Sequence, residues 1–191
     1  MYYEEFSLIQ REKSKYKILI VTDSKRKSII SYSYVVKYDM RIYLNEIKER
    51  FPHLEILNYD ENIYFENINH DSRVYIPNAL FVPIIGENFD GHNFISSSRC
   101  SVSLMQRDHL KRYDLKIPLI VVDNILEGLK EITEYVRGKV TVLVIGITGS
   151  TGKTTTRMMT SSILSQFSDV LTSERNINTL WGNSELLMTF S

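Results

Sequence analysis

The chain has 191 residues, 43% of them hydrophobic, so it is long enough for one full domain and part of another, with a real core. Its 23 basic and 23 acidic residues cancel, which excludes a net positive field that would attract nucleic acid or an anionic membrane. The single cysteine, Cys100, excludes an internal disulfide. No apolar run reaches the length of a signal sequence or a spanning helix, so we expect a cytoplasmic protein.

A zinc site is not expected. The four histidines are far apart along the chain, at His53, His70, His92 and His109. None of them has an acidic or cysteine partner at the spacing that zinc ligands show.

The first 39 residues are predicted to contain two short strands. Residues 16–21 form an apolar run, residues 29–36 are β-branched and aromatic, and a polar turn separates them. From Met40 apolar residues recur at helical spacing, so a short amphipathic helix is expected up to Phe51, where Pro52 ends it. A strand is predicted behind it, over residues 54–57.

The polar segment around residue 72 is a candidate for anion binding. Ser72 offers a hydroxyl and Arg73 a planar fork of donors, which together suit a phosphate or a carboxylate. In the alternative interpretation, Asp71 caps a turn and Arg73 pairs with an acid at the surface. These residues alone favour neither interpretation.

Alternating strands and helices continue to residue 138 and indicate an α/β architecture. Strands are expected over residues 80–84, 101–104 and 118–122, and helices near residue 93, around 108–113 and over 124–137. Gly138 is predicted to occupy the C′ position that ends the last helix. We place a domain boundary at Gly138 and Lys139.

A glycine-rich stretch follows the apolar run of residues 140–145 and reads G-I-T-G-S-T-G-K-T-T-T from Gly146 to Thr156. Strand, glycine turn and helix start in this order build a phosphate cradle, because glycines admit close backbone approach and N–H groups at a helix N-terminus point at an anion. Lys153 would neutralise the β- and γ-phosphates, and the Thr154 hydroxyl would complete the shell of a magnesium ion. The strict G-x-x-x-x-G-K-[ST] pattern needs glycine at Ile147, so this loop is a variant.

The segment after the loop is predicted to be a helix from residue 153 to 166, with Met159, Ile163 and Phe167 on its buried face. A strand at residues 170–171, a polar loop over 172–183 and a closing helical turn at 186–188 follow. These are only about two strands of a phosphate-loop domain, so we expect the chain to hold the truncated start of such a domain.

Three separated segments resemble the Mur ligases, ATP-dependent enzymes that extend the UDP-linked peptidoglycan precursor, and above all the members that add D-alanyl-D-alanine. The first is the D-S-R motif at residues 71–73, and the second is the G-E-x-F-D-G-H-x-F-I loop at residues 86–95. The third is the phosphate loop at residues 146–156, which has the family's offset glycine. The resemblance covers residues 40–191 and leaves residues 1–39 as an extension of unknown role.

The resemblance implies a small α/β N-terminal domain that binds the UDP-linked precursor, over residues 40–138. It implies the truncated start of a central ATP-binding domain of the P-loop type, with a parallel sheet, over residues 139–191. In the implied reaction, ATP phosphorylates the terminal carboxylate of a UDP-MurNAc-peptide, and the amine of an amino acid or of D-Ala-D-Ala displaces the phosphate. We expect no turnover from these 191 residues alone.

The ATP side of the implied site lies in the glycine-rich loop. Lys153 would be the catalytic residue that stabilises the transferring phosphoryl group, and Thr154 would bind Mg²⁺. The phosphate-binding residues implied by the resemblance are Gly149, Ser150, Thr151, Gly152, Lys153, Thr154 and Thr155.

On the substrate side, Ser72 and Arg73 would face the UDP part of the precursor, and Asn176 and Asn178 would line the centre of the site. A second hypothesis is a non-catalytic or degenerate nucleotide-binding module related to these ligases. It is motivated by departures from the family pattern, such as the Asn78-Ala79 pair in place of Gly-Asp. Binding of a labelled UDP-linked precursor would separate the two hypotheses.

Overall fold

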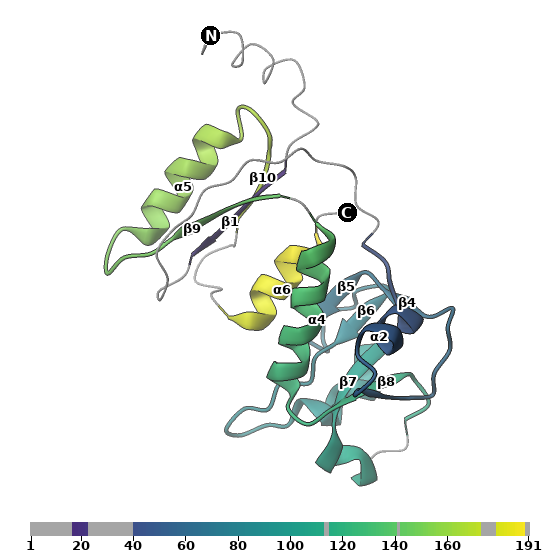
Figure 1. The fold of residues 1–191 in the computed structure, drawn as a ribbon. Helices are drawn as coiled ribbons and strands as arrows, with labels where there is room; N and C mark the ends of the chain where they lie inside the picture. Colours follow the sequence, from purple (N-terminus) through teal and green to yellow (C-terminus); the bar gives the residue numbers. More distant parts are fainter. Residues whose placement is uncertain (1–16, 23–39, 113–114, 141, 173–178, 190–191) are drawn as a thin grey trace. The chain divides into compact units, whose positions relative to one another are not determined.

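The computed structural model describes residues 17–22, 40–112, 115–140, 142–172 and 179–189 (Figure 1). This part of the chain forms two compact units. The first contains residues 17–22 and the described part of 139–186, and the second contains residues 40–138 with 187–189. The strand expected at residues 29–36 and the candidate residues Asn176 and Asn178 lie outside the described residues.

A five-stranded sheet forms the centre of the second unit, in the order β3-β8-β7-β6-β5. Strand β3 is antiparallel to β8, and the other neighbours are parallel. The strands are β3 (Glu55–Leu57), β5 (Asn67–Asn69), β6 (Ala79–Phe81), β7 (Val102–Gln106) and β8 (Leu119–Val122). Both β6 and β8 are buried at every position, as apolar strands of a covered parallel sheet are. The predicted α/β fold is therefore confirmed as a mixed α/β arrangement with a mostly parallel sheet.

Helix α4 (Ile125–Lys139) packs on this unit through the apolar residues that the sequence predicted. It buries Ile125, Leu129, Ile132 and Val136. Gly128 allows the close approach to β8, because a Cβ at this position would lie 2.4 Å from Val122 Cγ1. The predicted C′ role of Gly138 is wrong, since the helix continues through it to Lys139. One glycine costs a helix only about 1 kcal/mol relative to alanine, which the helix tolerates.

Shorter elements complete the second unit. Strands β2 (Ile42–Tyr43) and β4 (Tyr64–Phe65) form an antiparallel ribbon. Helix α2 (Leu44–Arg50) buries Leu44 and Ile47. The 3₁₀ helix η1 (Gly91–Phe94) leads into α3 (Ile95–Ser98), and η2 (Arg107–Arg112) follows β7. The polar helix expected near residue 108 is thus a 3₁₀ helix.

The sheet of the first unit has the order β10-β1-β9, and all its strands are parallel. Its strands are β1 (Lys17–Thr22), β9 (Leu143–Ile147) and β10 (Asp169–Thr172). The central strand β1 pairs Ile18 with Leu143 on one side and with Val170 on the other. Part of the N-terminal extension therefore belongs to the sheet that carries the glycine-rich loop.

Helix α5 (Lys153–Leu164) lies against these strands, where Leu164 packs with Leu143. The predicted buried face of this helix is wrong. The side chains of Met159 and Ile163 are exposed, with 63% and 58% of their surface accessible, whereas Arg157 is buried. Residues 157, 161 and 164 share a helical spacing as good as that of 159 and 163, so periodicity did not distinguish the two faces.

Helix α6 (Leu180–Met188) begins within the segment 172–183 that was predicted to be a polar loop. The hydroxyl of Thr179 accepts a hydrogen bond from the Gly182 N–H group at 3.3 Å and so caps the helix start. Among the described residues, no helix combines the length and apolar character that crossing a bilayer requires.

Candidate functional site

The glycine-rich loop connects β9 to α5 in the predicted order of strand, turn and helix. Gly152 is the N-cap of α5 and has a φ of 78°, in the left-handed region that glycine adopts without strain. The first intrahelical hydrogen bond runs from the Thr156 N–H group to the Gly152 carbonyl at 2.9 Å. The N–H groups of the preceding residues therefore point out of the helix end, where an anion would meet them.

The side chains of this loop are available to a ligand. Ser150, Thr151, Thr154 and Thr155 are all exposed. Lys153 is half-buried, and its ammonium group donates to the Gly149 carbonyl across the loop. Lys153 is thus held over the loop where phosphates would lie, and a hydroxyl oxygen of Thr154, a hard donor, suits Mg²⁺. The chemistry of these groups fits the predicted phosphate and magnesium site.

The second unit contains a cavity of about 400 Å³. The nine residues that line it are His70, Asp71, Ser72, Arg73, Phe81, Ile84, Phe89, Gly91 and Phe94. They come from the loop before β6, from the end of β6 and the loop after it, and from η1. The structure thus brings Ser72 and Arg73 together with the F-D-G-H loop, which follows them by about 17 residues, in one pocket.

Arg73 pairs with Asp71, as the second of the two sequence interpretations held. Its Nε and NH2 groups donate to Oδ1 and Oδ2 of Asp71 at 2.8 and 2.6 Å. The side-chain hydrogen bond from Arg73 lowers the pKa of Asp71 from 3.8 to about 2. Because 87% of the Arg73 side chain remains accessible, the pair leaves guanidinium surface at the pocket rim for an anion.

Two aromatic residues of the pocket were not identified as site residues from the sequence. Phe89 and Phe94 are both exposed, although large aromatic side chains are usually buried. They line the same pocket as Ser72 and Arg73, and their rings can stack on a planar ring such as a nucleobase. The signal that could have found them is the position of both phenylalanines in the F-D-G-H-x-F loop.

The shape of the loop depends on Gly91. Its N–H group donates to the Ile84 carbonyl at 3.0 Å, and Ile85 forms a β-bridge with Asp90. A Cβ on Gly91 would come within 2.6 Å of the Ile84 carbonyl oxygen, so the backbone approach excludes every other residue type. Gly91 therefore holds the pocket-lining loop against the segment that follows β6.

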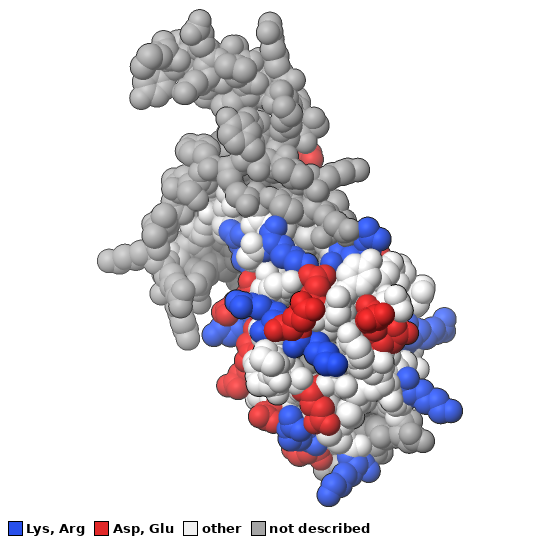
Figure 2. Space-filling view, turned by 45° about the vertical axis from the view of Figure 1, so that its right-hand side comes forward, with Lys and Arg blue, Asp and Glu red and all other residues white. Residues whose placement is uncertain are grey.

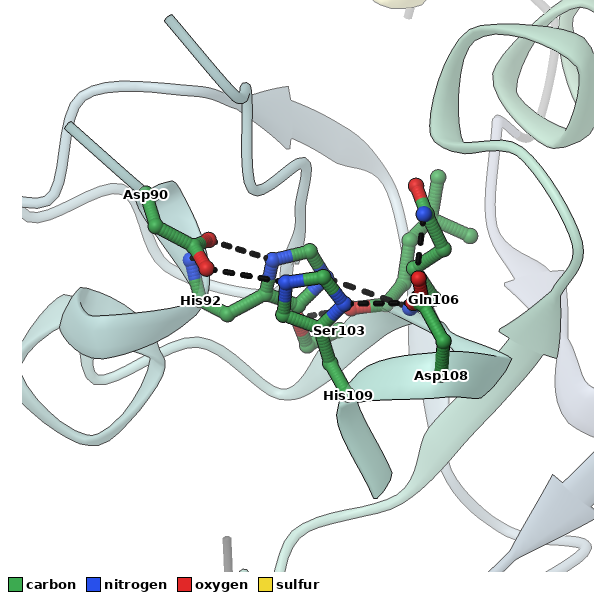
Figure 3. Close-up of polar contacts among 7 residues, drawn as sticks. Asp90, His92, Ser103, Gln106, Asp108 and His109 are labelled. Atoms are coloured by element: carbon green, nitrogen blue, oxygen red, sulfur yellow. Dashed lines mark hydrogen bonds and ion pairs between the residues drawn. The ribbon is translucent and has the colours of Figure 1, made fainter. Parts of the chain in front are cut away.

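A cluster of polar side chains lies beside this loop (Figure 3). Asp90 Oδ1 accepts from the His92 backbone N–H group at 2.9 Å and lies 2.7 Å from His92 Nδ1, while His109 Nε2 lies 2.9 Å from Asp90 Oδ2. The expectation that no histidine has an acidic partner at zinc-ligand spacing overlooked Asp90, which stands two positions before His92. His109 joins this pair from 17 positions beyond His92, a contact that spacing could not show.

Charges on the face seen in Figure 2 are mixed, with acidic and basic side chains interspersed. No continuous patch of one sign covers the coloured part of this face. This agrees with the zero formal net charge of the chain. Any anion recognition is therefore local to the loop and the pocket.

Comparison with known proteins supports a specific relationship, although no family model matches the chain. The chain is 30% identical to a UDP-N-acetylmuramoyl-tripeptide–D-alanyl-D-alanine ligase from Synechocystis over 81% of its own length, and 32% identical to that of Escherichia coli over 61%. A UDP-N-acetylmuramoylalanyl-D-glutamyl-2,6-diaminopimelate–D-alanyl-D-alanyl ligase from Acinetobacter baumannii has a similar structure over 78% of the chain, with a TM-score of 0.64 and 27% identity. The chain spans about a third of the length of the first and third of these relatives and 26% of the second.

Proposed function

We propose that this chain takes part in ATP-dependent amide bond formation on a UDP-linked muramoyl peptide, because it belongs to the Mur ligase family. In this proposal the second unit binds the UDP part of the precursor, and the first unit binds the phosphates of ATP. The amine that is joined is an amino acid or D-alanyl-D-alanine. The reaction draws on ATP and the nucleotide-linked precursor, and we place it in the cytoplasm.

The observation that carries the proposal is the joint presence of two sites of matching chemistry. One is the β9–loop–α5 cradle with Lys153, and the other is the cavity that unites Arg73 with the exposed rings of Phe89 and Phe94. A cradle alone fits many nucleotide-binding proteins. An arginine beside two aromatic rings suits a ligand with both a phosphate and a base, which is what UDP offers.

The proposed chemistry is phosphoryl transfer followed by acyl transfer. A carboxylate oxygen of the precursor attacks the γ-phosphorus of ATP, the bond to the β–γ bridging oxygen breaks, and ADP leaves. The amine then attacks the acyl phosphate carbon, loses a proton and displaces inorganic phosphate. Positioning and charge neutralisation carry most of the catalysis in such reactions.

Lys153 has the central role on the ATP side of this proposal. Its ammonium group would move from the Gly149 carbonyl to the transferring phosphoryl group and stabilise the charge that develops there. The N–H groups from Gly149 to Thr155 would hold the phosphates. Bound Mg²⁺, with Thr154 as one ligand, would supply further charge neutralisation.

Calorimetric titration of the 191-residue chain with UDP, and separately with ATP and Mg²⁺, tests the proposal. We expect both ligands to bind. Arg73→Ala should weaken only UDP, and Lys153→Ala should weaken only ATP, each about tenfold or more. Binding of ATP without UDP would instead favour the degenerate nucleotide-binding module, and binding of neither would refute both functions.

A further inference from the structure

Two buried histidines from different elements stack on one another beside the pocket loop. His92 belongs to η1, next to the pocket-lining Gly91, and His109 belongs to η2. Their ring centroids are 4.3 Å apart, with 20° between the ring planes. The two side chains are 0% and 10% exposed. Figure 3 shows both rings turned toward Asp90 with one nitrogen each.

The hydrogen bonds give each ring a different role. The Gln106 backbone N–H group donates to His92 Nε2 at 3.1 Å, so the proton of His92 is on Nδ1, where it reaches Asp90. His92 is therefore neutral. His109 faces carboxylates with both nitrogens, Nε2 toward Asp90 at 2.9 Å and Nδ1 toward Asp108 at 2.5 Å. His109 therefore links Asp90 of the pocket loop to Asp108 of its own element.

The same atoms do not form a convergent metal site. One ligand atom from each of Asp90, His92 and His109 lies within 4.8 Å of the others. However, an imidazole lone pair lies in the plane of its ring, and two rings stacked at 20° direct their lone pairs side by side instead of toward one point. The cluster is therefore held together by hydrogen bonds and not by a metal ion.

Asp90 connects this cluster to the pocket. One of its oxygens caps η1 by accepting from the His92 N–H group, and the other binds His109. Asp90 and His92 flank Gly91, whose backbone lies against Ile84. A change at His109 is therefore transmitted to the segment that carries Phe94 and follows Phe89.

We propose that His109 is a positioning residue of the pocket, which through its stack on His92 and its contact with Asp90 holds the Phe89–Phe94 loop in the ligand-binding conformation. The identity of the ligand, a uridine nucleotide, rests on the proposed function. The effect of His109 on the loop does not.

This arrangement makes the loop sensitive to acid. Among the described residues, the titratable groups that face His109 are Asp90 and His92 from the loop and Asp108 from its own element. Gain of a proton by His92 breaks the bond from Gln106. Loop order, and with it ligand affinity, should therefore decline when the pH falls far enough to protonate His92.

His109→Phe tests the proposal, because it keeps a stacked ring and removes both ring nitrogens that face carboxylates. Lys111→Ala, an exposed change on the same 3₁₀ helix, is the matched control. In the free chain we expect His109→Phe to speed amide hydrogen exchange over residues 90–94 about tenfold, and Lys111→Ala to leave it unchanged. Long-range ¹H–¹⁵N spectra of the wild-type rings should show His92 with its proton on Nδ1.

UDP affinity measured from pH 5 to 8 gives the second readout. The wild type and Lys111→Ala should lose affinity on the acid side, and His109→Phe should bind about tenfold more weakly at neutral pH. Unchanged exchange and unchanged affinity in His109→Phe would overturn the positioning role. If the wild type binds no UDP but His109→Phe still loosens the loop, the proposed function fails and the positioning role stands.

Should His109→Phe not fold, Asp108→Asn keeps both rings and removes one of the two carboxylates. It should speed amide exchange over residues 90–94, because it weakens one of the two contacts that fix the His109 ring. Unchanged exchange would contradict the proposal.

Discussion

Arg73 and Asp71 are joined at two points, with Nε to Oδ1 at 2.8 Å and NH2 to Oδ2 at 2.6 Å. Asp71 Oδ1 also accepts from the Arg73 backbone N–H group at 3.0 Å, so the pair folds a tight turn at the pocket rim. The guanidinium is thereby fixed in orientation while most of it stays in solvent. A fixed, exposed guanidinium is suited to bind an oxyanion with little loss of side-chain entropy.

Replacing Arg73 should therefore weaken UDP binding. We expect about a tenfold loss for Arg73→Ala, and most of that loss for Arg73→Lys, because an ammonium group cannot make the two-point contact. Arg107→Ala is the matched control, since Arg107 is also paired with surface acids, Glu55 and Asp123, but does not line the pocket. Calorimetric titration with UDP measures the affinity of all three variants. An equal loss of affinity in Arg107→Ala would show that Arg73 contributes only through its positive charge and not through a direct contact.

Two glycines should respond to alanine in opposite ways. Gly152 has a φ of 78°, so alanine there is strained by about 1 kcal/mol and should weaken ATP binding by disturbing the loop. Gly138 lies inside α4 with no atom within 4 Å of a Cβ, so alanine there should stabilise the chain by about 0.5–1 kcal/mol. Urea denaturation and ATP titration of both variants check this. Stabilisation by Gly152→Ala would show that the φ value does not constrain the loop.

His92 should make the stability of the second unit depend on pH. Burial lowers the pKa of His92 below 6.5 in the folded chain, and the unfolded chain takes up the proton near 6.5. The unfolded state then binds more protons, so the stabilisation is complete above pH 6.5 and declines as the pH falls below it. The slope approaches about 1.4 kcal/mol per pH unit.

Hydrogen exchange of the amides of β7 and β8 between pH 5 and 8, corrected for intrinsic rates, measures this dependence. His92→Gln should be less stable at pH 8 but should lose the decline below pH 6.5, because its amide does not titrate. His53→Gln serves as the control, since His53 is exposed and contacts Glu131 on the surface. The carboxyls of Asp90 and Asp108 have lowered pKa values, so their contributions are lost only below about pH 3.8 and do not overlap with that of His92.

The sheet of the first unit should depend on β1. Ile20 pairs with Ile145 of β9 and Thr172 of β10 in the centre of the sheet. Proline at this position removes a ladder hydrogen bond from a central strand, so Ile20→Pro should expose the amides of β9 to exchange. The amides of β7 in the other unit should keep their protection. Protection of β9 that survives Ile20→Pro would show that β1 is dispensable.

The local sequence pattern was sufficient to predict structure where the conformation of a segment depends on the residues within that segment. The apolar run, the glycines and Lys153 predicted a strand, a turn and a helix, and Gly152 takes the left-handed conformation that the turn needs. The apolar spacing of Leu129, Ile132 and Val136 likewise predicted the buried face of α4, because a 3.6-residue period needs no distant partner. Periodicity was insufficient for α5, where two faces have equal spacing and contact with the strands chose the one with Arg157.

The sequence by itself determined the family resemblance, the mixed α/β class and the two candidate anion sites, since each depends on residues adjacent in the chain. Only the tertiary structure decided which partners these residues meet. Register places Lys17–Thr22 between β9 and β10, and the return of η2 to the pocket loop stacks His109 on His92. Such contacts join residues that are distant in sequence, and the packing that selects them leaves no periodic signal along the chain.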